Sequence, residues 1–113
     1  MSKNYPEITK ETFNTLKELR NHIPEVMQST FNLSQNVLKD GVLSKKTKEM
    51  LALAIAVVTR CDGCIGVHTQ ALVKEGITIE ELTELLGVAI LMGGGPAIMT
   101  SAEVMHAYSQ FKN

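Results

Sequence analysis

The sequence has no tryptophan and few aromatic residues, which make up 4% of its 113 positions. A core built from it must be aliphatic, and we expect close-packed alanine, leucine, valine and methionine side chains. The sequence also has no excess of positive or negative charge, since its formal net charge is −1 and acidic and basic residues are interspersed. The chain therefore lacks the basic patch by which proteins bind nucleic acid, and we expect no nucleic-acid partner.

No apolar run is long enough to cross a bilayer, which takes about 20 residues. The run 50–58 lies between charged residues and is expected to form a central helix, buried on nearly every side. The longer uncharged stretch 85–102 is divided into two helices by the segment Gly93–Pro96. The N-terminus has no apolar run of the secretory kind. We expect a cytoplasmic protein with no membrane partner, in a reducing compartment where cysteine pairs are more often catalytic than structural.

The whole chain has a helical pattern, since no stretch alternates apolar and polar residues as a strand would. Its length favours one domain over residues 1–113, with a flexible segment 1–7. We predict an all-α bundle of about six helices from apolar periodicity and capping signals. The expected helices cover residues 9–21, 24–40, 45–60, 62–75 and 79–92, and a last helix opens at 96 and ends before a short polar tail.

Capping residues mark the ends of these helices. Ser44 precedes the third helix, and Thr78 with Glu81 forms the pattern of a capping box before the fifth. The other expected signals are Thr9 as the first N-cap, Gly41 as a left-handed terminator of the second helix, and Pro96 at the first position of the last. These signals put the two cysteines of the chain at the junction of the third and fourth helices.

The two cysteines stand together in Cys61-Asp62-Gly63-Cys64, and His68 follows Cys64 by four residues. Residues four apart share one face of a helix, so a helix that begins near Asp62 carries both thiols and the imidazole on one side. A helix N-terminus or an imidazolium lowers the pKa of a cysteine from about 8.5 to roughly 3.5–7.5. The spacing predicts a redox centre in which Cys64 attacks with His68 as its base, and Cys61 resolves the product as a disulfide.

Other interpretations of the pair stay open. Cys61, Cys64 and His68 could be three zinc ligands, but a closed structural site needs four and usually draws on a second Cys or His pair. His22 and His106 each stand alone. With an open fourth position, the same three residues could instead serve a metal-dependent lyase or hydrolase. The cysteines could also be an inert buried pair, since buried cysteines are common.

The mean hydropathy is positive, which indicates more apolar surface than one small helical monomer can bury in its core. We therefore expect a homo-oligomer. A well-packed monomer is the alternative, because small helical bundles also fold alone. A non-enzymatic redox sensor, whose disulfide changes the assembly, is a second possible function.

Several motifs together resemble a known family. They are Leu43-Ser44-x-Lys46-x-Lys48-Glu49 with the apolar helix after it, Cys61-x-x-Cys64-x-x-x-His68, Gly76, Thr78-x-x-Glu81 and Gly93-Gly94-Gly95-Pro96. The combination is similar to the carboxymuconolactone decarboxylase superfamily and, within it, to the AhpD-like alkylhydroperoxidase branch. The resemblance covers roughly Leu33 to Tyr108, and the spacing Glu-x11-Cys-x2-Cys-x3-His is more specific than a bare C-x-x-C.

This resemblance implies an all-helical fold that assembles into trimers or hexamers, with a dithiol centre that reduces peroxides or exchanges disulfides. It implies that Cys64 attacks the peroxide and that Cys61 resolves. It also implies that His68 withdraws the proton and that Glu49 completes the proton relay. The implied partners are a small hydroperoxide or disulfide and a protein thiol reductant or external dithiol, and no bound cofactor or metal is expected.

The sequence departs from the branch at one position. In hydroperoxidases of the branch a tyrosine of the proton relay precedes the second cysteine, whereas this chain has Gly63. The missing phenol removes one proton donor, which predicts weak peroxidase activity or a different substrate, but it leaves the dithiol intact. Members with decarboxylase activity on muconolactones lack the paired cysteines, so Cys61 and Cys64 argue against that chemistry.

Glu49 is the predicted site residue that lies furthest from the thiols. It precedes Cys61 by twelve residues, which is about 18 Å along a straight helix. It reaches the thiols if the fourth helix folds back along the third, or if a neighbouring subunit supplies it. A solvated carboxylate in the first turn of a helix is the alternative.

Overall fold

The computed structural model describes residues 2–113, and within them it contains helices and loops but no strand. The helices are α1 (Tyr5–His22), α2 (Pro24–Leu38), α3 (Lys45–Thr59), α4 (Asp62–Lys74), α5 (Ile79–Gly93) and α6 (Gly95–Lys112). The predicted all-α fold is confirmed. In this part of the chain, none of the helices has the length and apolar character needed to cross a bilayer.

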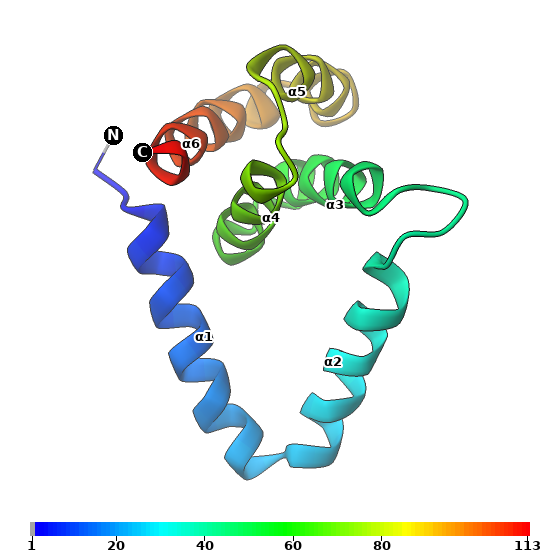
Figure 1. Ribbon diagram of the computed structural model, residues 1–113. Coiled ribbons are helices and arrows are strands. Elements are labelled where there is room, and N and C mark those ends of the chain that lie inside the picture. Colours follow the sequence, from blue (N-terminus) through cyan, green and yellow to red (C-terminus); the bar gives the residue numbers. More distant parts are fainter. Residues whose placement is uncertain (1) are drawn as a thin grey trace.

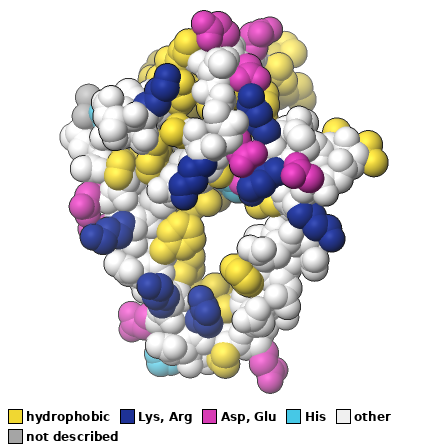
Figure 2. All heavy atoms as spheres, viewed as in Figure 1, with side chains coloured by type: hydrophobic (Ala, Val, Ile, Leu, Met, Phe, Trp, Pro, Cys, Tyr) yellow, Lys and Arg dark blue, Asp and Glu magenta, His cyan; other side chains and the backbone are white. Residues whose placement is uncertain are grey.

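Helices α3 to α6 pack into one body, and α1 and α2 form a V-shaped arm that extends from it (Figure 1). Helix α1 contacts α4 and α6 of the body, whereas α2 contacts α1 and α3. No residue of α2 is buried. Apolar side chains line the inner side of the arm, where a hollow separates α1 from α2 (Figure 2). The body therefore holds the core, and the arm leaves apolar surface uncovered.

The core lies between the four helices of the body, with Tyr5 from the start of α1 added to it. It is aliphatic apart from two tyrosines, as the shortage of aromatic residues predicts. Methionine was expected there too, but no described methionine is among the buried residues: Met50 packs against the core from its edge, and Met92 and Met99 are 75% and 69% exposed. The buried apolar residues are Tyr5, Leu53, Ala56, Val57, Ile65, Leu72, Ile77, Leu82, Leu85, Leu86, Ala89, Ala97, Val104, Ala107 and Tyr108.

The predicted caps of α3 and α5 are confirmed. The hydroxyl of Ser44 accepts the N–H of Thr47 at 3.1 Å. The hydroxyl of Thr78 accepts the N–H of Glu81 at 3.1 Å, and the Glu81 carboxylate accepts the N–H of Thr78 at 2.9 Å. Each bond satisfies a backbone donor that the first turn of a helix leaves unpaired. Both helices therefore begin where local sequence predicts.

The first helix begins earlier than predicted. Asn4 caps it instead of Thr9, because the Asn4 side chain accepts the N–H of Glu7 at 3.0 Å. Thr9 is buried inside the helix. The segment 1–7 was expected to be flexible, and its first residue lies outside the described part of the chain. From Tyr5 onward this segment is helical, because the Tyr5 side chain is fully buried against the body.

Three other helix ends also differ from the prediction. Helix α2 ends at Leu38 and passes into an extended Lys39, and Gly41 is not among the residues with positive φ. Pro96 is the second residue of α6 and not the first. The N–H groups at the first and second positions of a helix both lack an intrahelical partner, so proline is accommodated at either position. Helix α6 continues to Lys112, which leaves no polar tail of the expected kind.

Helix α3 is central but not buried on all sides. It contacts α2, α4, α5 and α6, and Leu53 and Val57 are fully buried. On the other side, Leu51 and Ile55 are 53% and 64% exposed. The expectation that residues 50–58 are buried on nearly every side is wrong for the single chain, because no described element covers this face.

Candidate functional site

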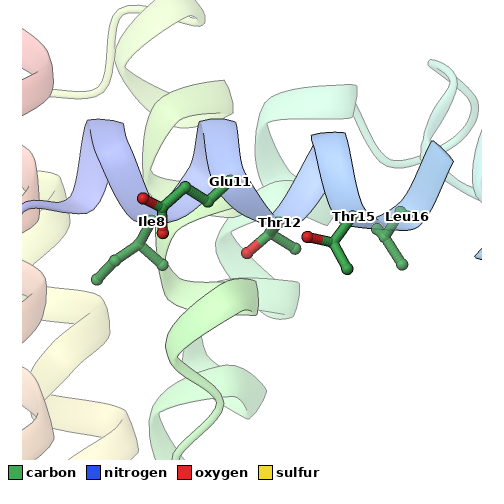
Figure 3. Close-up of a pocket in the computed structure, with 5 residues that line it drawn as sticks. All are labelled: Ile8, Glu11, Thr12, Thr15 and Leu16. Atoms are coloured by element: carbon green, nitrogen blue, oxygen red, sulfur yellow. The ribbon is translucent and has the colours of Figure 1, made fainter. Parts of the chain in front are cut away.

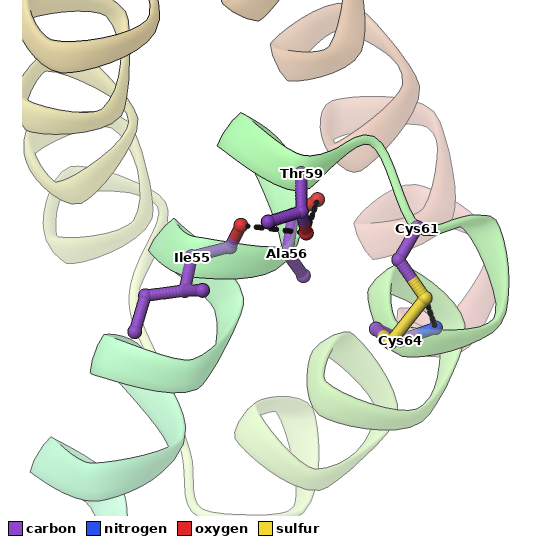
Figure 4. Close-up of a disulfide and its surroundings, with 5 residues drawn as sticks. All are labelled: Ile55, Ala56, Thr59, Cys61 and Cys64. Atoms are coloured by element: carbon purple, nitrogen blue, oxygen red, sulfur yellow. Dashed lines mark hydrogen bonds between the residues drawn. A yellow bond between two sulfur atoms is a disulfide. The ribbon is translucent and has the colours of Figure 1, made fainter.

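The connection from α3 to α4 turns at Arg60. It leads directly into the cysteine pair (Figure 4). Arg60 is left-handed, with φ 56° and ψ 51°. Its N–H donates to the carbonyl of Val57 at 3.3 Å, and the N–H of Cys61 donates to the carbonyl of Ala56 at 3.1 Å. These are the two bonds of a Schellman motif. A left-handed non-glycine residue costs about 1–2 kcal/mol. The two hydrogen bonds offset this cost at Arg60 and stabilise the turn that leads into the new helix at Cys61.

Cys61 and Cys64 are joined by a disulfide in the first turn of α4 (Figure 4). Cys61 is the N-cap, and its Sγ accepts the N–H of Cys64 at 3.2 Å. Both residues are partly buried. The predicted helix start near Asp62 is confirmed. Because the sulfurs lie at the positive end of the helix dipole, reduction of the disulfide would leave a thiol pair in a setting that favours thiolate.

His68 lies one turn further along α4 and pairs with Glu49 of α3. Nδ1 of His68 and Oε1 of Glu49 are 2.6 Å apart. The Glu49 side chain is 4% exposed, and its second oxygen lies 3.4 Å from Nζ of Lys45. Helix α4 therefore folds back along α3 and brings the two groups together within one chain. Glu49 is not the solvated carboxylate of the alternative interpretation.

This pair determines which imidazole nitrogen is available for chemistry. A carboxylate accepts hydrogen bonds and cannot donate them, so Nδ1 of His68 carries the proton that Glu49 accepts. In the neutral ring the lone pair is then on Nε2, for which residues 2–113 supply no hydrogen-bond partner. A carboxylate that orients an imidazole in this way prepares the other nitrogen to accept a proton. The catalytic roles of Cys61, Cys64, His68 and Glu49 stay predictions.

Asp62, between the two cysteines, is held by residues that sequence reasoning missed. Nζ of Lys3 lies 2.9 Å from Oδ2 of Asp62, and the hydroxyl of Tyr5 donates to Oδ1 at 3.4 Å. Lys3 also pairs with Glu103 of α6 at 2.7 Å. No spacing rule could reveal these contacts, because 59 positions separate Lys3 from Asp62.

Most of the chain, including the site, matches the model of one protein family. Residues 24–107 match the model of the Carboxymuconolactone decarboxylase family. The chain belongs to this family. The matched part of this carboxymuconolactone decarboxylase family member contains Glu49, Cys61, Cys64 and His68, and it begins after α1. The predicted membership is therefore confirmed.

Two crystal structures of the carboxymuconolactone decarboxylase family resemble this one along most of its length. A family protein from Legionella pneumophila, in its apo form, has a TM-score of 0.93 and 47% sequence identity, and the match covers 96% of this chain and 97% of that chain. A family protein from Thermotoga maritima has a TM-score of 0.73 and 30% identity, over 87% and 90% of the two chains. A part in an antioxidative response has been suggested for the Thermotoga protein.

The alkyl hydroperoxide reductase AhpD of Coxiella burnetii is a more distant relative of this family member. The two are 27% identical over 63 residues, which are 56% of this chain and 36% of that one. The chain thus matches about a third of AhpD. This relationship supports the AhpD-like resemblance and leaves the activity as a proposal.

Gly66 of α4 lets α1 lie close to the dithiol of this family member. A β-carbon on Gly66 would overlap the hydroxyl oxygen of Thr9. A β-carbon on Gly63 would lie 3.9 Å from Cγ2 of Thr12, which is ordinary contact. Helix α1 therefore passes beside the position where the hydroperoxidase branch is expected to carry its tyrosine.

The concavity in Figure 3 lies along α1 and is not the dithiol site. Its lining residues are Ile8, Glu11, Thr12, Thr15 and Leu16. None of the four predicted site residues is among them. In the described part of the chain, no three side chains from His, Cys, Asp and Glu lie together as metal ligands would. The groups that this family member offers for chemistry are the cysteine pair and the His68–Glu49 pair.

Proposed function

We propose that the protein is a thiol-dependent oxidoreductase that reduces a small hydroperoxide or a disulfide through Cys61 and Cys64. The observation that carries the proposal is a disulfide at the start of α4 with a carboxylate-oriented imidazole one turn away. A helix N-terminus favours the thiolate, and an oriented imidazole is an effective general base. The name of the AhpD relative, an alkyl hydroperoxide reductase, supports the same chemistry.

In the proposed peroxide reaction, Cys64 acts first. Nε2 of His68 takes the proton of the thiol, while Glu49 stabilises the resulting imidazolium through Nδ1. The thiolate attacks one peroxide oxygen, so that an S–O bond forms and the O–O bond breaks. Two electrons pass from sulfur to the peroxide, and the imidazolium protonates the departing alkoxide to give an alcohol. Cys64 is left as a sulfenic acid.

Cys61 then resolves this intermediate. Its sulfur attacks the sulfur of Cys64, the S–S bond forms, and the hydroxyl leaves as water with the proton of the Cys61 thiol. A protein thiol reductant or external dithiol restores both cysteines by exchange. The reductant's two thiols become a disulfide and supply the two electrons and two protons. The cycle needs no bound cofactor.

A disulfide substrate fits the same site. The Cys64 thiolate would attack one substrate sulfur and release the other as a thiol, and Cys61 would then displace the remaining substrate thiol from the mixed disulfide. This route makes less demand on a proton donor than O–O cleavage, because the departing thiolate is less basic than an alkoxide and leaves without being protonated first. Gly63, which carries no phenol, therefore favours a substantial disulfide-reductase activity beside peroxide reduction.

We also propose that the protein assembles with copies of itself, as the trimers or hexamers that the family resemblance implies. Ile55, Val88 and Met92 on α3 and α5 are 64%, 59% and 75% exposed and line an apolar hollow of about 270 Å³. Phe13 and Phe31, which face the hollow of the arm, are 46% and 55% exposed. Extended apolar surface of this kind marks interaction sites.

Peroxide consumption by the purified protein, with a dithiol as reductant, tests the function. Cys64→Ser should abolish turnover. With the dithiol removed after reduction, Cys61→Ser should consume one equivalent of peroxide and then stop at the sulfenic acid, which a dimedone adduct detects. A model disulfide, assayed in parallel, measures the second activity.

Three outcomes would contradict the proposal. Full turnover of both substrates by Cys64→Ser means that the mechanism is wrong. A reversible disulfide that changes the oligomer size without any turnover favours the redox sensor. Stoichiometric zinc in the purified protein, lost in Cys61→Ser, favours the metal-dependent alternative.

A further inference from the structure

The residues before and at the start of α1 cross from α6 to α4, and we call residues 3–5 the N-terminal strap. The carbonyl of Lys3 accepts hydrogen bonds from Nε2 of His106 at 2.8 Å and from Nε2 of Gln110 at 3.1 Å. The N–H of Tyr5 donates to Oε1 of Gln110 at 2.9 Å. Three bonds to α6 therefore fix the backbone of the strap, and the buried Tyr5 ring anchors it further.

The N-terminal strap engages both oxygens of Asp62, with Lys3 on one and the hydroxyl of Tyr5 on the other. Hydrogen bonds to Asp62 and then to Glu103 raise the pKa of Lys3. Burial, followed by the charges of Asp62 and Glu103, raises the pKa of Tyr5 to about 12. Lys3 is therefore a cation and Tyr5 a neutral donor at neutral pH.

Asp62 acts on the dithiol in two opposed ways. Its carboxylate suits the first turn of α4, where the helix dipole favours negative charge. The same carboxylate stands between Cys61 and Cys64 in the chain, where a like charge disfavours a thiolate. The Lys3 cation, which Asp62 shares with Glu103, keeps the benefit to the helix and reduces the repulsion.

We propose that Lys3 is a positioning residue of the dithiol: it neutralises Asp62, and it thereby favours the thiolate of Cys64 and makes the disulfide a stronger oxidant. The inference rests on the proposed dithiol chemistry. Oxidation removes the thiolate charge, so a counter-charge that stabilises the thiolate stabilises the reduced form over the disulfide. The titratable groups that contact Asp62 or its cation are Tyr5 of the strap and Glu103 of α6, while His68 and Glu49 pair with each other one turn away.

Thiolate titration of the reduced protein, followed by ultraviolet absorbance, tests this role. Lys3→Met should raise the pKa of the Cys64 thiol by about 0.5, a small shift because the ion pair is partly exposed. Asp62→Asn should lower it by a similar amount. In the Asp62→Asn background, Lys3→Met should have little effect, because the charge it offsets is gone. Lys3→Arg should keep the wild-type value, and Lys10→Met on the exposed side of α1 is the matched control.

The thiol–disulfide equilibrium with glutathione gives a second readout. Lys3→Met should make the disulfide harder to reduce, and Asp62→Asn should make it easier, each by about threefold. Opposite signs separate electrostatics from simple loosening of the strap, since loosening would move both variants in the same direction. Shifts of the same sign, or none, overturn the inference. If Lys3→Met does not fold, as judged by circular dichroism, an unshifted Asp62→Asn overturns it instead.

The same measurements keep this inference apart from the proposed function. Opposed shifts in a protein that turns over neither peroxide nor disulfide would refute the function and leave the counter-charge role in place. Turnover that depends on Cys64, together with unshifted titrations, would refute the role of Lys3 alone.

Discussion

His68 and Glu49 are 19 positions apart in the chain, and their side chains meet at 2.6 Å. His68 can be identified from its i+4 spacing to Cys64, because that relation lies within one helix. Glu49 can be proposed from family spacing alone, since its partner is on another helix. A buried carboxylate is costly unless it is paired, and His68 and Lys45 supply the partners here. The contact between them thus gives the buried Glu49 carboxylate a hydrogen-bond partner and also orients the His68 imidazole.

Replacement of His68 should slow the chemistry and spare the fold. His68→Gln can still donate to Glu49 but cannot act as a base near neutral pH, and we expect kcat/KM for the favoured substrate to fall about 100-fold. Steady-state kinetics and the alkylation rate of Cys64 measure the loss. His22→Gln, at the exposed end of α1, is the control. Equal activity of the two variants would remove His68 from the mechanism.

At the scale of elements, the packing of α1 on α4 shapes the surroundings of the dithiol. Pattern reasoning placed Thr9 at the start of a helix, yet Thr9 is buried beside Gly66. The error arose because Thr9 fits an N-cap equally well by composition, and only the packed helix shows that Asn4 holds that role. The close approach of α1 also explains how Lys3 and Tyr5 reach Asp62, 59 and 57 positions away.

This packing predicts opposite effects at two glycines of the same helix. Gly66→Ala should destabilise the protein by about 1–3 kcal/mol, because the added methyl overlaps Thr9 in a close-packed contact. Gly63→Ala should be neutral or stabilise by up to about 1 kcal/mol, since alanine favours the helix and meets only ordinary contact at Thr12. Urea unfolding of the reduced proteins measures both. A Gly66→Ala variant as stable as Gly63→Ala would mean that α1 does not lie this close to α4.

At the scale of the whole molecule, the single chain leaves much apolar surface exposed. No residue of α2 is buried, and Ile55 and Met92 on the body are mostly exposed. Hydropathy predicted this excess, but it could not say which faces would carry it. The fold places the excess in two regions, the inner side of the arm and the α3–α5 face, and both fit the proposed self-assembly.

A charge on the α3–α5 face should therefore disrupt assembly. Ile55→Glu places a carboxylate in the apolar hollow beside Val88 and Met92, and burial of an unpaired charge in an interface is costly. Sedimentation velocity should show a smaller species than wild type. Thr83→Glu lies two and a half turns before Met92, on the opposite side of α5, and should leave the size unchanged. A monomeric wild type, or an unaltered Ile55→Glu assembly, contradicts the proposal.

The sequence by itself determined the helical class, the caps at Ser44 and Thr78, and the start of a helix at the cysteine pair. These features depend on interactions between residues a few positions apart, which spacing rules describe. Tertiary structure alone decided that Glu49 meets His68, that Lys3 reaches Asp62, and which face of α3 stays exposed. Those outcomes depend on how the helices pack, and packing brings together groups whose separation along the chain carries no local signal.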